Sequence, residues 1–374
     1  MRMPVLWICG PTGVGKSTVG WQVFADLEQA GIPVAYVDVD QVGMCYPAPA
    51  DDPHNQRLKV RNIARVVENF RAAGAHCVIV SGTVDASQAH TYADQFVGTS
   101  LRFCRLRVGS GELVRRLRER GWDAELQAEA LAEAETLDRS DFTDLYVDTD
   151  RLSVADVARL ARVDLRPQAG HPVEPDQWSA PSGKVLWLCG PTGVGKSAVG
   201  FEIFQSLLGS GVPAAYLDLE QIGLSRPVPA DDPAGHRIRA RNLADLWQSF
   251  REAGAERLVV AGPVEDEDAL DVYKAELELT LVRLHAEHRQ LAERIQLRAE
   301  GIGWRAPGDS LAGQPPEVVR QVTANAQRLA DDLERNGLGD VRLDTTTLTI
   351  TEAANLAMRS FVGIRPLTRA DKCG

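Results

Sequence analysis

Two stretches decide how this chain folds: LWICGPTGVGKSTVG at residues 6–20 and LWLCGPTGVGKSAVG at residues 186–200. They differ only at Ile8/Leu188 and at Thr18/Ala198. In each stretch an apolar run typical of a buried strand leads into a loop of the form G-x-x-x-x-G-K-S, and helical periodicity follows the loop. This strand–loop–helix order is the setting of a phosphate-binding loop.

The residue types of the loop fit that chemistry. Glycines let backbone N–H groups turn toward a phosphate, and the following helix adds its positive N-terminal end. We expect Lys16 to reach the β- and γ-phosphates of a nucleotide and the Ser17 hydroxyl to ligate Mg²⁺. The alternative is a glycine-rich turn with a solvated lysine. Of the 41 basic residues only six are lysines, and Lys16 and Lys196 are two of them. The predicted nucleotide-binding residues are Gly10, Pro11, Thr12, Gly13, Val14, Gly15, Lys16, Ser17 and Thr18, with Gly190, Pro191, Thr192, Gly193, Val194, Gly195, Lys196, Ser197 and Ala198.

The spacing of the two stretches predicts a tandem duplication. Leu6 and Leu186 lie 180 positions apart, which gives one domain over residues 1–166 and another over 183–366. Residues 167–182, rich in proline and small polar residues, are expected to be a linker, and residues 367–374 a tail. Strands alternate with helices in both halves, so the predicted fold is α/β, with two doubly wound parallel-sheet P-loop domains. Ligands then belong at the carboxyl ends of the strands.

Composition narrows the class of partner. The net charge of −11 and the pI of about 5.2 argue against a broad nucleic-acid or membrane-binding surface. The chain has no apolar stretch of the ~20 residues that a membrane span needs, and its N-terminus leads directly into the first strand. We therefore expect a cytoplasmic protein whose partner is a small molecule.

Acidic residues follow the second strand of each half, in YVDVDQ (36–41) and YLDLEQ (216–221). We expect Asp38 and Asp40 to point the same way from an extended strand, because alternate residues of a strand share a face. The alternative is that the acids cap the next turn. In the second half the pair becomes Asp218 and Glu220.

With these residues placed, each half resembles the P-loop small-molecule kinases, the group that includes adenylyl-sulfate, shikimate, gluconate and nucleoside monophosphate kinases. The runs Asp38-Val-Asp40-Gln41 and Lys59-Val-Arg61-Asn62-Ile63-Ala-Arg65 are similar to two motifs of adenylyl-sulfate kinase. Three features depart from that family: Lys59 replaces an arginine, Gly43 stands where an arginine is expected, and its lysine-rich lid is not found.

The resemblance implies ATP and Mg²⁺ as cofactors and a small-molecule phosphate acceptor. It implies that Asp38, and Asp218 in the second half, hold Mg²⁺ together with Ser17 and Ser197, and that Asp40 meets the acceptor hydroxyl. It also implies that acceptor contacts come from Lys59, Arg61, Asn62 and Arg65. The alternative for this last group is a solvated helical face.

Two arginine pairs follow the fourth strand of each half. Arg116 and Arg120 are four residues apart, hence on one helical face, and Arg294 and Arg298 repeat this spacing. By resemblance to nucleoside monophosphate kinases, such a pair opens the lid, one guanidinium stacking over adenine and the other reaching a phosphate. A solvated basic face is the alternative.

We therefore predict an ATP-dependent phosphotransferase whose first half is the main catalytic unit. The predicted catalytic residues are Lys16, Asp38, Asp40, Arg116 and Arg120. The second half carries Glu220 for Asp40 and Asp245 for Arg65, and its lid region is longer, including residues 305–316. The alternative function is a nucleotide-binding switch or scaffold with incidental ATP hydrolysis.

Overall fold

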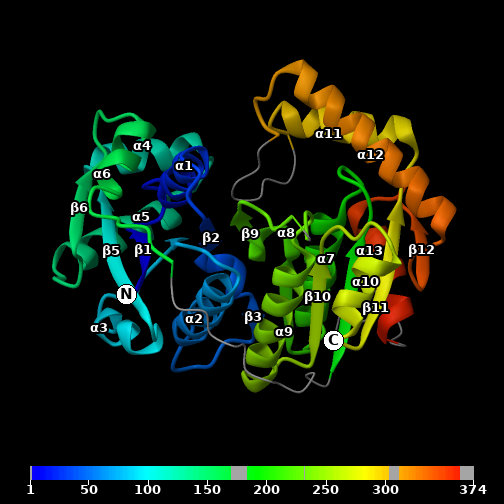
Figure 1. Cartoon of the computed structure of the whole chain (residues 1–374), viewed down its shortest axis with the longest axis horizontal. Helices are drawn as coiled ribbons and strands as arrows, with labels where there is room; N and C mark the ends of the chain where they lie inside the picture. The colour runs from blue at the N-terminus through cyan, green and yellow to red at the C-terminus, as the bar shows by residue number, and fades with distance from the viewer. Residues whose placement is uncertain (1, 170–182, 231, 303–310, 363–374) are drawn as a thin grey trace. The chain divides into compact units, whose positions relative to one another are not determined.

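The computed structural model describes residues 2–169, 183–230, 232–302 and 311–362 (Figure 1). Most of the expected linker, the whole expected tail and the first part of residues 305–316 lie outside the described residues. The chain divides into two compact units, and neither is one continuous segment. The first consists of the described residues of 1–43, 49–178 and 221–246, and the second of those of 44–48, 179–220 and 247–374. The continuous boundaries expected from the sequence stay a prediction.

The first unit is built on a six-stranded sheet in the order β6-β5-β1-β4-β2-β9. Five strands are parallel, and β9 pairs antiparallel with β2 at the edge. The strands are β1 (Met3–Cys9), β2 (Val34–Asp38), β4 (Cys77–Ser81), β5 (Thr99–Arg107), β6 (Leu145–Asp148) and β9 (Leu224–Arg226). The helices are α1 (Lys16–Gln29), α2 (Gln56–Ala72), α3 (Ala89–Tyr92), α4 (Ser110–Glu119), α5 (Ala124–Asp138) and α6 (Val154–Ala161), with 3₁₀ turns at η1 (Val39–Val42) and η2 (Ala93–Gln95).

Helices cover both faces of this sheet, which explains why β1 is buried at every residue. Leu6 and Ile8 point to the face covered by α1 and α6, where they join one hydrophobic cluster. Trp7 points to the other face and packs against Tyr92 and Phe103. The predicted α/β fold class is confirmed, except that each sheet has one antiparallel edge strand.

The second unit has the sheet order β12-β11-β7-β10-β8-β3, again parallel except at the edge, where β3 pairs antiparallel with β8. The strands are β7 (Lys184–Cys189), β8 (Ala214–Asp218), β10 (Arg257–Ala261), β11 (Leu279–His285), β12 (Val341–Asp344) and β3 (Cys45–Tyr46). The helices are α7 (Lys196–Gly209), α8 (Leu219–Ile222), α9 (His236–Glu252), α10 (Glu267–Lys274), α11 (His288–Ala299), α12 (Pro316–Asn336) and α13 (Ile350–Val362); α8 and α9 cross the boundary between the units.

Each glycine-rich loop follows the central strand of its sheet and needs backbone conformations that only glycine adopts freely. Gly10 has φ +140°, and a Cβ there would lie 2.5 Å from the Leu106 carbonyl oxygen. Gly190 repeats this geometry with φ +138° and a Cβ position 2.6 Å from the Leu284 oxygen. Because a backbone oxygen of the neighbouring strand cannot move aside, no larger residue fits at either position.

This constraint predicts a difference between two glycines of the first unit. Gly31 also has a positive φ (+72°), but a Cβ there would meet nothing within 4 Å. Gly31→Ala should lower the free energy of unfolding by about 1 kcal/mol, the cost of left-handed backbone. Gly10→Ala adds the clash and should cost roughly 2–4 kcal/mol. Urea denaturation of the full chain measures both, and equal midpoints for the two variants would contradict the assigned loop geometry.

Candidate nucleotide-binding sites

The first loop presents a helix start without a side-chain cap. α1 begins at Lys16, and Gly15 at its N-terminus makes no capping hydrogen bond, so the first backbone N–H groups of the helix remain available for an anion. The Lys16 ammonium donates to the carbonyl oxygens of Gly10 and Pro11, at 3.0 and 3.2 Å. Burial lowers the pKa of Lys16, while nearby acids oppose this shift.

The second loop has the same architecture. Gly193 and Gly195 have φ +83° and +103°, close to the +88° and +107° of Gly13 and Gly15. α7 begins at Lys196, again with no side-chain cap. The Lys196 ammonium donates to the Pro191 carbonyl oxygen at 3.1 Å. Both predicted loops therefore have the backbone form that cradles phosphates.

In the first unit the residue after the loop lysine meets the acid at the end of β2. The Ser17 hydroxyl donates to Asp38 Oδ2 at 2.9 Å, and the Ser81 hydroxyl donates to the same oxygen at 2.9 Å. Asp38 Oδ1 accepts from the Asp40 N–H. Burial, together with the charge of Asp40, raises the pKa of Asp38. A hydroxyl and a carboxylate facing each other supply the hard oxygen ligands that Mg²⁺ takes alongside phosphates.

The second unit repeats the pair but not its surroundings. The Ser197 hydroxyl donates to Asp218 Oδ2 at 2.8 Å, and the Glu220 N–H donates to Asp218 Oδ1 at 3.0 Å. Ala261 ends the strand that pairs with β8, where Ser81 ends the equivalent strand of the first unit. Asp218 thus lacks a counterpart of the Ser81 hydroxyl. Burial raises the pKa of Asp218 to about 6, and the charge of Glu220 adds to this effect.

The expectation that Asp38 and Asp40 project from one extended strand was wrong. β2 ends at Asp38, and Asp40 lies in the 3₁₀ turn η1, which the Asp38 carboxylate caps. The turn forms because Asp38 offers an acceptor to the backbone N–H two residues on, as acids after strands often do. Asp38 is buried, whereas 63% of the Asp40 side chain is exposed. The two acids therefore occupy different environments.

The proposed acceptor residues are divided between an exposed ion pair and the interior. The Lys59 ammonium lies 2.9 Å from Asp40 Oδ1, and its aliphatic stem fills the space where a Cβ on Gly43 would stand. This packing explains a glycine at position 43. Asn62 is fully buried and donates to the Val42 carbonyl oxygen at 2.6 Å. Arg65 donates to the Asp245 carbonyl oxygen at 3.1 Å within the first unit.

The remaining α2 residue, Arg61, is half-buried. Of the α2 residues predicted to bind an acceptor, the structure therefore brings Lys59 to Asp40. It directs the Asn62 amide and the Arg65 guanidinium to backbone carbonyl groups.

The first arginine of each predicted lid pair contacts the phosphate-binding loop. Arg116 Nη1 donates to the Val14 carbonyl oxygen at 3.1 Å, and Arg294 Nη1 donates to the equivalent Val194 oxygen at 3.2 Å. Both also contact a threonine after the last strand, Thr149 and Thr345 respectively. Burial lowers the pKa of Arg294.

The second arginine of each pair lies one helical turn further on. Arg120 is exposed at the end of α4, and Arg298 is half-buried in α11. The loop contacts described above come from the first arginine of each pair.

Two functional candidates carried no recognisable signal in the sequence. Ser81 was visible only as the residue at the end of a predicted strand, and its hydrogen bond to Asp38 needs the parallel pairing of β2 with β4. Glu133 of α5 accepts hydrogen bonds from the Thr12 N–H at 2.8 Å and from the Thr12 hydroxyl at 2.9 Å. No motif marks Glu133, because this contact joins residues 121 positions apart.

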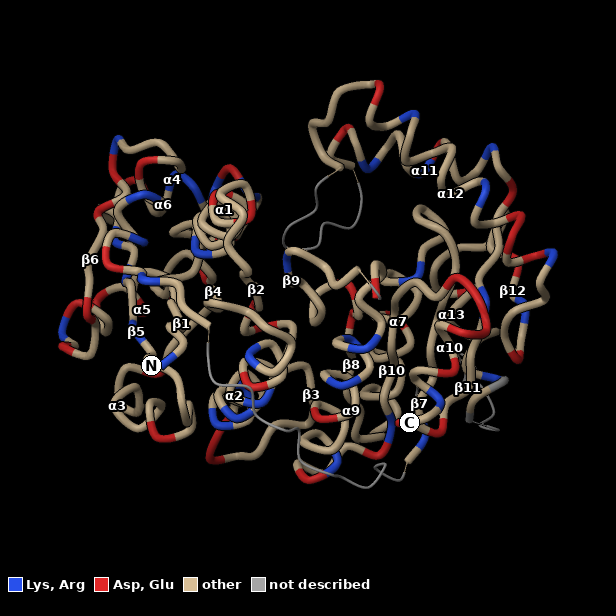
Figure 2. The backbone as a smooth tube through the Cα atoms, viewed as in Figure 1, with Lys and Arg blue, Asp and Glu red and all other residues tan. Residues whose placement is uncertain are grey.

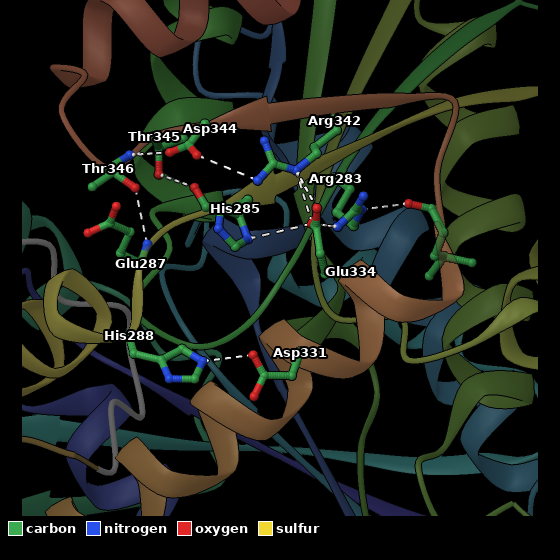
Figure 3. A network of polar contacts seen from close by, with 11 residues as sticks. Arg283, His285, Glu287, His288, Asp331, Glu334, Arg342, Asp344, Thr345 and Thr346 are labelled. Carbon is green, nitrogen blue, oxygen red and sulfur yellow. Dashed lines mark hydrogen bonds and ion pairs between the residues drawn. The ribbon is translucent and has the colours of Figure 1, made fainter.

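A polar network joins α12 of the second unit to strands β11 and β12 (Figure 3). Arg283 of β11 and Arg342 of β12 converge on Glu334 of α12, and Arg283 also donates to the Leu338 carbonyl oxygen. In the first unit Arg105 of β5 holds the end of α5 in the same manner, through Asp138 and the Leu137 carbonyl oxygen. In both units a buried arginine therefore holds the C-terminal end of a helix, α5 in the first unit and α12 in the second.

No described helix is long and apolar enough to cross a membrane. Within the described ranges, no three His, Cys, Asp or Glu side chains gather as a metal site.

The raised pKa of Asp218 predicts a pH effect on stability. An unfolded aspartate has a pKa of about 3.9, so the folded protein favours the protonated form. The resulting contribution to stability is full below pH ~4 and is lost as the pH rises through about 6. Asp218→Asn should therefore raise the free energy of unfolding at pH 8 by about 1–3 kcal/mol in metal-free buffer.

Urea titrations at pH 4.5 and pH 8 measure this difference, which should be clearly smaller at the lower pH. The exposed Glu278, changed to Gln, is the matched control and should leave both curves in place. A variant as stable as the wild type at pH 8 would show that Asp218 is not strained by burial.

Comparisons with known proteins found a family model and solved structures that match parts of the chain. Residues 6–138 match a family model described as an AAA domain. Solved structures similar to the chain include a Deinococcus radiodurans tunicamycin resistance protein (20% identity, 45% of this chain and 99% of that one, TM-score 0.36). They also include a Sinorhizobium meliloti gluconokinase (21%, 43% and 91%, 0.31) and a Mycobacterium tuberculosis APS kinase in complex with AMPPNP and APS (21%, 48% and 96%, 0.29). A search of curated proteins gave no match. The segment that matches the family model, residues 6–138, contains the first loop with its phosphate-binding backbone form.

Proposed function

We propose that the protein is an ATP-dependent phosphotransferase that acts on a small metabolite or nucleotide. The observation that carries this proposal is the contact between the hydroxyl after the loop lysine and the strand-end carboxylate, at 2.9 Å for Ser17 and Asp38 and 2.8 Å for Ser197 and Asp218. Such a pair beside a phosphate-binding loop is what a Mg²⁺-nucleotide site requires. A cytoplasmic location and a small-molecule acceptor belong to the same proposal.

At the first site each group has a distinct task. Ser17 and Asp38 would hold Mg²⁺, which when bound neutralises charge between the β- and γ-phosphates. Lys16 would exchange its two carbonyl partners for phosphate oxygens, because charge-assisted hydrogen bonds to an anion are stronger. The exposed carboxylate of Asp40, held by Lys59, would orient the acceptor hydroxyl.

We propose the first half as the main catalytic unit. Its metal-site carboxylate is oriented by Ser81 as well as Ser17, whereas Asp218 faces Ala261. Its acceptor carboxylate, Asp40, is paired with the Lys59 ammonium at 2.9 Å. The charge difference between Arg65 and Asp245 does not support a division of roles between the halves, because these two residues contact each other.

A nucleotide-binding switch with incidental hydrolysis is the second candidate. The contact of Glu133 with Thr12 favours it, since a helix that contacts the phosphate-binding loop would have to respond to nucleotide. The two candidates differ in one property. A phosphotransferase is stimulated by its acceptor, and a switch hydrolyses ATP slowly whatever small molecule is added.

The test is transfer of labelled γ-phosphate from ATP to a panel of nucleosides, nucleotides, sugars, polyol acids and aminocyclitols. With the acceptor that responds, Lys16→Ala should lower turnover about 100-fold or more, because the lysine acts on the charge that develops at the phosphates. Lys196→Ala, the matched change in the second loop, should leave most of the activity. Slow hydrolysis without stimulation by any acceptor would favour the switch, and equal loss from both variants would refute the division between the halves.

A further inference from the structure

The first phosphate-binding loop already holds an anion that belongs to the protein. Glu133 Oε2 lies 2.8 Å from the Thr12 backbone nitrogen and 2.9 Å from the Thr12 hydroxyl. Backbone N–H groups of this loop are the groups that cradle phosphates. A carboxylate and a phosphate cannot both stand close to the same donor without strong repulsion, since like charges a few ångströms apart repel even at a partly solvated site.

The helix that carries Glu133 is unsuited to lie over a bound triphosphate. α5 contains five acidic residues and no basic one; Figure 2 draws acidic positions in red and basic positions in blue. A lid that closes over transferring phosphates is expected to bring positive charge to them. In its docked position α5 therefore places negative charge against any phosphate bound at the loop.

Glu133 can leave the loop without unfolding its helix. α5 is held at its C-terminal end by the buried Arg105, which contacts Asp138 and the Leu137 carbonyl oxygen. Its middle packs through Ala130 onto α4. The glutamate side chain adds a flexible link to Thr12, and a change of its rotamer alone would break that link.

The second unit provides an internal comparison. Among the described residues, no carboxylate lies within hydrogen-bond distance of Thr192, the equivalent of Thr12. α12, the helix in the place of α5, carries three arginines, Arg320, Arg328 and Arg335. The carboxylate on the loop is thus a property of the first site, as far as the described parts of the chain extend.

We propose that Glu133 is an internal competitor of the nucleotide phosphates at the first loop, so that ATP binds there only by displacing this carboxylate from Thr12. The inference rests on the proposed function in one respect, that the first loop binds a nucleoside triphosphate. It adds a regulated step: occupancy of the first site is coupled to release of the Glu133 side chain from the loop.

The experiment measures binding to the first site alone, by calorimetry on full-length Lys196→Ala protein. In that background Glu133→Gln keeps the size and an acceptor oxygen for Thr12 but removes the charge. We expect it to tighten binding of Mg²⁺-ATP and of inorganic tripolyphosphate about tenfold, because both present phosphates to the loop. Adenosine, which has no phosphate, should gain nothing.

Glu129→Gln is the matched control, because Glu129 is exposed one helical turn before Glu133. It should change each affinity less than about twofold, since its charge is further from the loop and screened by solvent. A thermal melt confirms that both variants are folded, and Glu133→Ala repeats the test if the glutamine variant is not.

The outcomes separate this inference from the proposed function. Unchanged or weaker phosphate binding in Glu133→Gln would overturn the inference, as would lost turnover at unchanged affinity, which is the signature of a catalytic base. No binding to the first site in any variant would overturn it too. Tighter binding without phosphate transfer to any acceptor would sustain the inference while the phosphotransferase proposal fails.

Discussion

The backbone N–H groups of the loop between β1 and α1 need hydrogen-bond acceptors, and the site of the first unit is built around this need. α1 starts at Lys16 without a side-chain cap, and the loop glycines turn further N–H groups inward. N–H groups at a helix start without a capping side chain need acceptors, and an anion is an acceptor that fits there. Lys16 turns its ammonium to loop carbonyl groups and Glu133 supplies a carboxylate to Thr12. The same demand that makes the loop a nucleotide site thus also attracts an internal ligand.

The acids at the ends of β2 and β8 carry a second energetic cost of building such a site, the burial of a carboxylate. Burial raises the pKa of both Asp38 and Asp218, which means that the folded protein holds these carboxylates at a penalty. Hydrogen bonds from Ser17 and Ser81 offset part of that penalty for Asp38, whereas Asp218 has Ser197 but faces Ala261. A cation bound beside either carboxylate would remove the remainder. Strain of this kind is common at functional sites.

The sequence predicts the main elements because their signals are local. Apolar runs, loop glycines and helical periodicity placed the strands on which both loops stand, and the α/β class followed from their alternation. The two edge strands, β3 and β9, were missed because each spans only two or three residues beside a proline-rich loop. So short a segment has no period to detect, and only its partner strand makes it part of a sheet.

Site residues were predictable where a motif fixes them and not where tertiary contacts do. Ser17 and Asp38 lie 21 positions apart and meet as the motif requires. Asp40 was assigned for a wrong geometric reason, since the cap formed by Asp38 ends the strand before it. Asn62 was expected to bind an acceptor, yet its amide donates to the Val42 carbonyl inside the fold. Glu133 could not be found, because its role depends on how α5 packs.

The central claim is that this chain builds two phosphate-binding loops, each able to hold one Mg²⁺-nucleotide. Equilibrium dialysis of labelled ATP against the full-length protein tests it most directly, because it counts bound nucleotides per chain without assuming any acceptor. We expect two bound nucleotides per chain at saturation. Nucleotide bound at the first loop should also exclude the Glu133 carboxylate from Thr12. Saturation at fewer than two nucleotides per chain, or binding that survives loss of both loop lysines, would contradict it.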